Sequence, residues 1–181
     1  MIVRAFSLIL SLCCCLLPIT ATATPHYGAN VSYAAYSIEP PSLHGYQLMF
    51  NYDPDCFHWR TFNIFFDGGF SHFSVNTPYY TTLNIYSVAP VIRYKFRQRG
   101  PIHPFLDISI GLAYLNHTHI GYRNLGIHFA FQDRFGIGVL FGQSEKLSVG
   151  VHAVHYSNAG LSDHNSGMTI PLSLDVGYRF D

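Results

Sequence analysis

Apolar and polar residues alternate with a period of two along most of the chain. Successive side chains of a β-strand point to opposite faces, so this period predicts strands with one apolar face and one small or polar face. The spacing of three and four residues that marks an amphipathic helix is not evident. We therefore expect eight strands, over residues 28–38, 43–53, 59–70, 81–96, 103–116, 127–140, 147–157 and 168–180.

The direction of the side chains follows from the alternation in the last of these strands but not in the fourth. In the last strand, Met168 and Ile170 share the apolar parity of the residues that follow, which leaves Thr169 on the polar face. In the fourth strand two apolar parities compete, and a β-bulge near residues 87–90 would reconcile them.

The connections between the expected strands alternate between compact turns and longer loops. The compact turns span 53–58, 97–101 and 141–146, and the longer loops span 71–80, 117–126 and 158–167. Strands of about ten residues with one apolar face, joined in this way, are typical of outer-membrane barrels with both termini on the periplasmic side. The sequence thus predicts an all-β fold, an eight-stranded antiparallel transmembrane β-barrel of the bacterial outer membrane. Such a narrow barrel is filled by its own side chains, which excludes a porin-like channel.

The composition favours a protein whose exterior faces lipid. Charged residues make up 11% of the chain and aromatic residues 16%, whereas an ordinary soluble domain has about 25% charged residues. Ten Lys and Arg balance ten Asp and Glu, and no basic stripe is present, so nucleic acid is not an expected partner. Among the few charges within the strands, Asp107 and Arg134 have inward parity, and we expect them to pair inside the barrel.

The first 23 residues have the three parts of a secretory signal peptide. Arg4 provides a positive start, residues 6–19 form a short apolar segment, and Ala21-Thr22-Ala23 supplies a small-x-small cleavage site. The apolar segment is shorter than the about 20 residues of a membrane-spanning helix. We expect residues 1–23 to be removed and residues 24–181 to form a single β-barrel domain.

Candidate metal ligands are scattered along the chain. Cys56 is the one cysteine after the expected cleavage site, and no CxxC motif is present, so we expect neither an intramolecular disulfide nor a metal site of that type. The histidines in the expected loops stand apart from one another. We therefore expect no metal and no other cofactor.

The strand 147–157 ends in two residues of chemical interest, His155 and Ser157. They share a parity with the apolar Leu147 and Val149, so both should lie on the lipid-facing wall, at the external end of the strand. Residues i and i+2 lie about 6.6 Å apart along a strand, near enough for an imidazole to reach a hydroxyl. A base beside a serine is the minimal unit of nucleophilic acyl transfer. Histidine and serine also occur at strand ends simply because the membrane interface is wet.

The residues around this pair resemble a known family. The segment His155-Tyr-Ser-Asn-Ala-Gly-Leu161 resembles the H-x-S-N signature of the outer-membrane lipid A 3-O-deacylases of the PagL type. The resemblance extends over residues 28–181, with further similar segments at 87–94, 104–112, 124–126 and 131–134. It implies an outer-membrane serine esterase that hydrolyses the 3-linked hydroxyacyl ester of lipid A in the outer leaflet. Lipopolysaccharide would be the substrate, and no metal or cofactor would be needed.

The same resemblance implies roles for individual residues. Ser157 would be the nucleophile and His155 the general base that later protonates the leaving hydroxyl. The oxyanion would be stabilised by the backbone N–H of Gly160 and the side chain of Asn165, with Asn158 nearby.

The chain departs from the family at the third member of the catalytic triad. The family has a Glu fourteen residues after the histidine, where this chain has Thr169, and no Glu follows Glu145. We expect Asp163, in the same loop, to orient His155, rather than Asp175, which has inward parity and lies deeper. Two hypotheses follow: an active lipid A deacylase, and a catalytically degenerate barrel of the same family with a structural or lipopolysaccharide-binding role. The sequence does not decide whether the barrel forms a homodimer.

Overall fold

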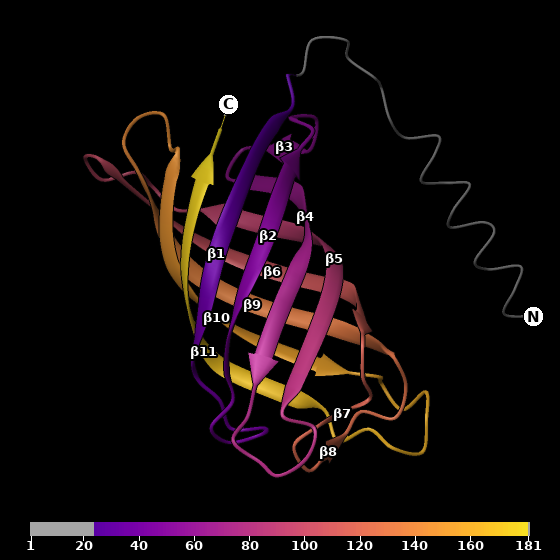
Figure 1. Ribbon diagram of the computed structural model, residues 1–181. Helices are drawn as coiled ribbons and strands as arrows, with labels where there is room; N and C mark the ends of the chain where they lie inside the picture. The colour runs from indigo at the N-terminus through magenta and orange to yellow at the C-terminus, as the bar shows by residue number, and fades with distance from the viewer. Residues whose placement is uncertain (1–23, 181) are drawn as a thin grey trace, which may run out of the picture.

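Eight long antiparallel strands close into a barrel in the computed structural model, which describes residues 24–180 (Figure 1). Each long strand pairs with the long strands before and after it, and β1 also pairs with β11, which closes the ring. The long strands are β1 (His26–Tyr36), β2 (His44–Asp53), β4 (Phe62–Ser74), β5 (Thr82–Lys95), β6 (Ile102–Leu115), β9 (Phe129–Phe141), β10 (Leu147–Ser157) and β11 (Met168–Arg179). The short strands are β3 (His58–Trp59), β7 (His119–Ile120) and β8 (Arg123–Asn124).

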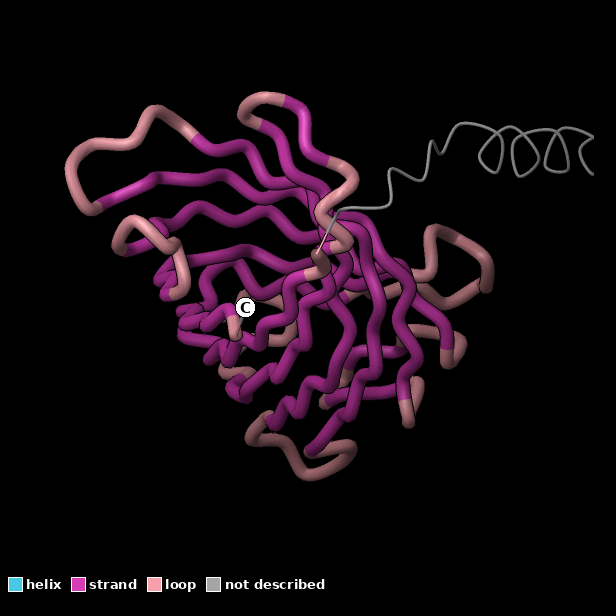
Figure 2. The backbone as a smooth tube through the Cα atoms, turned by 90° about the horizontal axis from the view of Figure 1, so that it is seen from above, coloured by secondary structure: helices cyan, strands magenta, loops and turns pink. Residues whose placement is uncertain are grey.

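The predicted eight-stranded antiparallel β-barrel is thus confirmed. Viewed from above, the described chain consists of strands joined by loops (Figure 2). Residues 24–180 form no helix that is long and apolar enough to cross a membrane. The expected signal peptide, residues 1–23, lies outside the described residues.

The expected strand boundaries lie within two residues of the observed ones, except in β4. That strand begins three residues later than expected, because residues 58–59 form a separate short strand that pairs with its first two residues. In β5 the expected bulge near residues 87–90 is wrong. This strand pairs with β4 without a shift from Thr82 to Tyr94. The competing parities arise because both faces of β5 are apolar over much of its length, one against the apolar interior and one on the exterior.

A β-bulge does occur in β11, next to Pro171. The register of β11 shifts by one residue against both β10 and β1 at this point, where a residue without an N–H is tolerated. Leu172 lies on the exposed face, whereas Met168 and Ile170 are fully buried inside the barrel. The expectation that these three residues share a face is therefore wrong. The bulge turns Thr169 to the outer wall instead of the interior.

The outer wall of the barrel is apolar and aromatic. Exposed side chains of this kind occur on every long strand; they include Tyr33, Phe50, Phe66, Val88, Ile110, Phe135, Val149 and Leu174. Such a surface is suited to contact with lipid tails.

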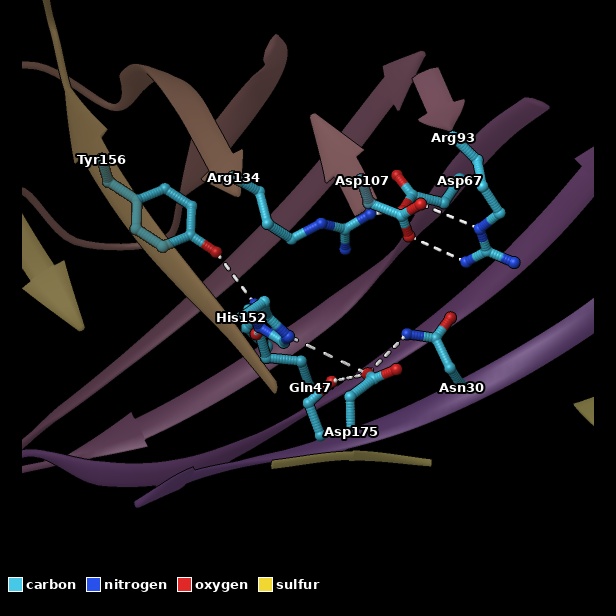
Figure 3. Close-up of polar contacts among 11 residues, drawn as sticks. Asn30, Gln47, Asp67, Arg93, Asp107, Arg134, His152, Tyr156 and Asp175 are labelled. Carbon is cyan, nitrogen blue, oxygen red and sulfur yellow. Dashed lines mark hydrogen bonds and ion pairs between the residues drawn. The ribbon is translucent and has the colours of Figure 1, made fainter. Parts of the chain in front are cut away.

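A polar network occupies the middle of the interior (Figure 3). Arg93 donates two hydrogen bonds to Asp107, each 2.8 Å long, from Nε and from one terminal nitrogen. Arg134 forms a buried ion pair with Asp67. The expected pairing of Asp107 with Arg134 is therefore wrong, although both side chains point inward. The register of β5 and β6 places Arg93 directly opposite Asp107, so the Asp107 carboxylate bonds to Arg93 and not to Arg134.

The two ends of the barrel differ. Both ends of the described chain lie at one of them, together with the turns 96–101 and 142–146 (Figure 1). The opposite end, called the loop end below, carries residues 37–43, the hairpin of β7 and β8, and the loop 158–167. An apolar cluster fills the interior near the loop end; it includes Phe73, Leu83, Leu115, Leu125, Tyr156 and Ile170. The outer wall beside this cluster carries His155 and Ser157.

Candidate active site

β10 places His155 and Ser157 on the outer wall of the barrel at its loop end. The neighbouring side chains of Tyr156 and Asn158 point inward and are fully buried, whereas His155 and Ser157 are half-buried. Side chains alternate along a strand, so the two residues share the outward face with the exposed Val149. The structure therefore gives this pair the outward direction that its parity indicated.

The imidazole of His155 is held from the neighbouring strand. Its Nδ1 lies 2.8 Å from the hydroxyl oxygen of Thr169, which is its partner residue on β11. This pairing depends on the bulge at Pro171, because an unshifted register would place Ile170 opposite His155. With Nδ1 engaged, Nε2 is the ring nitrogen for which no hydrogen bond is found among residues 24–180.

Gly167 packs against the edge of the same imidazole. It has a φ of +64°, which favours glycine, and a Cβ added there would lie 3.1 Å from Cε1 of His155. A side chain at this position would therefore require the ring to move by a few tenths of an ångström. Together with Thr169, this contact restricts the positions that the imidazole can adopt.

The three candidates for oxyanion stabilisation have different surroundings. The Nδ2 of Asn158 donates to the carbonyls of Leu125 and His164, both at 2.8 Å, and its Oδ1 accepts the N–H of Gly160 at 2.9 Å. Asn158 therefore ties the loop together from inside, and the Gly160 N–H is already bonded. Asn165 accepts the backbone N–H of Asn158 at 3.0 Å through Oδ1. Its Nδ2 is the group that could donate to a developing oxyanion.

The structure does not bring Asp163 to His155. Asp163 lies exposed in the loop, and among residues 24–180 it makes no hydrogen bond or ion pair. Asp175 lies inside the barrel, where it accepts hydrogen bonds from Asn30 and Ser32. The position beside Nδ1 belongs to Thr169 instead.

A carboxylate that the sequence did not point to lies behind Thr169. The Thr169 hydroxyl donates to Oε2 of Glu39 at 3.2 Å. Arg123 lies 3.3 Å from the same oxygen and also donates from Nε to the carbonyl of Gly167 at 3.1 Å. Glu39 is 130 residues from Thr169 along the chain, so no spacing or motif could have indicated the contact.

Asp133 on β9 is the other carboxylate in register with His155. It is the cross-strand partner of His155 on the side away from Thr169, and its side chain is exposed on the outer wall. No hydrogen bond between the two is found. Asp133 is therefore a neighbour in register without a contact to either ring nitrogen.

Comparison with known proteins identifies the family. A family model described as lipid A 3-O-deacylase (PagL) matches residues 44–179. The chain belongs to this family. It is 35% identical over 127 residues to a lipid A deacylase PagL of Pseudomonas aeruginosa, a match that covers 68% of this chain and 71% of the relative. A second lipid A deacylase PagL, from Bordetella bronchiseptica, is 29% identical over 94 residues, which cover 52% of this chain and about half (49%) of the relative.

Solved structures show the same architecture. The crystal structure of the outer membrane enzyme PagL has a TM-score of 0.67 and 30% identity, and the match covers 86% of this chain and 99% of that one. The neisserial surface protein A, NspA, has a TM-score of 0.58 at 13% identity, over 86% of this chain and 95% of that one. The second likeness concerns the fold alone.

Proposed function

We propose that the protein is a lipid A 3-O-deacylase, a serine esterase that hydrolyses the 3-linked hydroxyacyl ester of lipid A. The observation that carries the proposal is that His155 and Ser157 share the outer wall at the end of β10, with Nδ1 of the histidine 2.8 Å from the Thr169 hydroxyl and no hydrogen bond found for Nε2 among residues 24–180. Membership of the lipid A 3-O-deacylase family supports the choice of substrate. No cofactor enters the proposed reaction.

In the first half of the reaction, Ser157 Oγ attacks the carbonyl carbon of the ester while His155 Nε2 takes the hydroxyl proton. The bond from the carbonyl carbon to the sugar oxygen then breaks, and His155 returns the proton to that oxygen. In the second half, water attacks the acyl-serine with His155 again as base, which releases the 3-hydroxy fatty acid and restores the serine. We assign Asn165 Nδ2 to the oxyanion, with Asn158 and Gly160 shaping the loop that carries it.

The location of the site agrees with a substrate held in the membrane. From Ser157 toward the opposite end of β10, the outward positions are Ala153, Val151 and Val149, an apolar wall along which acyl chains can lie. We propose that the barrel sits in the outer membrane with its loop end toward the outer leaflet. Both ends of the described chain lie at the other end, which is periplasmic in such barrels.

Mass spectrometry of lipid A tests the function. Membranes that contain the wild-type protein should lose one 3-hydroxyacyl chain per lipid A, and Ser157→Ala and His155→Ala should abolish the loss. Ser166→Ala is a matched control, because this hydroxyl lies exposed in the same loop and should leave the reaction intact. The shift in gel mobility on heating verifies that each variant folds.

Two results would overturn the assignment. Equal deacylation by the wild type and by Ser157→Ala would show that Ser157 is not the nucleophile. No mass change with a folded, inserted wild-type barrel would favour the catalytically degenerate alternative, which the Thr at position 169 keeps open.

A further inference from the structure

We propose that Glu39 is a positioning residue for His155 and acts through the hydroxyl of Thr169. The inference rests on the proposed function, because it assigns His155 as the base. It concerns how this chain orients that base when the position of the family's glutamate holds a threonine.

Two hydrogen bonds of the Thr169 hydroxyl, one to Glu39 and one with His155, determine the tautomer of His155. An ionised carboxylate has only acceptor sites, so Glu39 can bond Thr169 only if the hydroxyl hydrogen points to Glu39. The oxygen of that hydroxyl then offers its lone pairs to His155, 2.8 Å away. It can bond Nδ1 only if Nδ1 carries the hydrogen. The carboxylate thus selects the tautomer in which Nε2 is unprotonated and able to act as a base.

The backbone keeps Glu39 and Thr169 in register. The N–H of Thr169 donates to the carbonyl of Glu39 at 2.7 Å, and the N–H of Glu39 lies 3.3 Å from the carbonyl of Thr169. The hydroxyl of Ser37 lies 3.2 Å from the same carbonyl of Thr169 and 2.7 Å from that of Pro40, to which its hydrogen can also point. Residues 37–39 therefore extend the sheet at this corner, and the carboxylate of Glu39 is positioned by main-chain bonds that a side-chain substitution leaves in place.

Arg123 supplies the opposite charge. It pairs with Glu39 at 3.3 Å and donates to the carbonyl of Gly167, the residue that packs on His155. Three connections of the loop end meet at this guanidinium: the one after β1, the hairpin of β7 and β8, and the loop before β11. The positive charge therefore lies beside the carboxylate oxygen that accepts from Thr169.

The experiment measures kcat and KM of the full-length protein with purified lipid A in detergent micelles. Glu39→Gln and Thr169→Val should each lower kcat about 10- to 100-fold, the size of effect found when a metal-ligating histidine loses the hydrogen-bonded partner behind it, and should change KM little. Thr169→Ser keeps the hydroxyl and should retain activity. The double variant Glu39→Gln with Thr169→Val should lose no more than either alone, because both act on one path.

Two further variants separate positioning from a structural role. Asp133→Asn is the matched acidic control and should leave kcat unchanged. Glu39→Gln combined with Thr169→Glu places a carboxylate directly at Nδ1 and should recover most of the lost kcat. If Glu39→Gln lowered kcat through a folding defect instead, a second substitution at position 169 would not restore it.

The ¹⁵N chemical shifts of His155 give a readout that does not need activity. In the wild type Nδ1 should be protonated, and in Glu39→Gln the two tautomers should mix, because an amide can donate as well as accept. An unchanged kcat or an unchanged tautomer in Glu39→Gln would overturn the inference, as would a loss in Asp133→Asn or Asp163→Asn without one in Glu39→Gln. Activity that depends on Ser157 but not on Glu39 refutes this inference alone, whereas activity that does not depend on Ser157 refutes the proposed function.

Discussion

Replacement of Arg134 by methionine should destabilise the barrel far more than loss of a surface ion pair would. The side chain of Asp67 is 0% exposed and that of Arg134 is 8% exposed. Arg134 donates the one hydrogen bond found for this carboxylate among residues 24–180, since Oδ1 of Asp67 has no partner. Without Arg134, Arg93 is the one guanidinium left in the network of Figure 3 beside the carboxylates of Asp67, Asp107 and Asp175. We expect a loss of about 3–5 kcal/mol in the free energy of unfolding, because one buried charge is left uncompensated.

The double variant Arg134→Met with Asp67→Asn is the decisive comparison. It removes both charges, so it should be about 2 kcal/mol more stable than Arg134→Met alone. The measurement is urea unfolding in phospholipid vesicles, followed by the fluorescence of Trp59, the one tryptophan of the chain. A loss of less than about 1 kcal/mol in the single variant, the value of an exposed pair, would contradict the cost expected for a buried unpaired charge. So would a double variant that is no more stable than the single one.

Two other sites give predictions of different kinds. Gly167→Ala should lower the deacylation rate about 10-fold without unfolding the barrel, because the added Cβ pushes the ring of His155 by a few tenths of an ångström and the φ of +64° strains an alanine; a wild-type rate in the folded variant would contradict this. At the other end, burial alone would raise the pKa of Glu145, but the hydrogen bonds and charges of Lys95 and His103 outweigh it and hold that pKa below its ordinary value. Glu145 then adds stability above the ordinary glutamate pKa of about 4.3, and the contribution is lost as the pH falls through the lowered pKa. Glu145→Gln should therefore be less stable than the wild type at pH 7 and equal to it in acid, as urea unfolding at several pH values can check; a pH-independent difference would argue against the ion pairs.

The barrel and the direction of its outer wall could be predicted because both depend on a local period. Side chains alternate along any strand, so the outward direction of His155 and Ser157 follows from their parity with Val149. In β11 the prediction from alternation was wrong for residues 168–170, because a single extra residue at the bulge reverses the direction of the side chains that precede it. Pro171 hinted at an irregular strand, but only the pairing with β10 and β1 shows where the shift falls.

The choice of partners within the barrel and around the site was decided by tertiary structure. Closure of the ring sets the start of the barrel against its end, and this brings Glu39 to Thr169 across 130 residues. The amino-acid sequence on its own contains the strands, the pair of His155 and Ser157, and the absence of the family's glutamate, since each of these is a matter of residue type and short spacing. The contact of the Glu39 carboxylate with Thr169 depends instead on the register between β1 and β11, which are distant in the chain. This contact forms only when the hydrogen bonds between these two strands close the sheet.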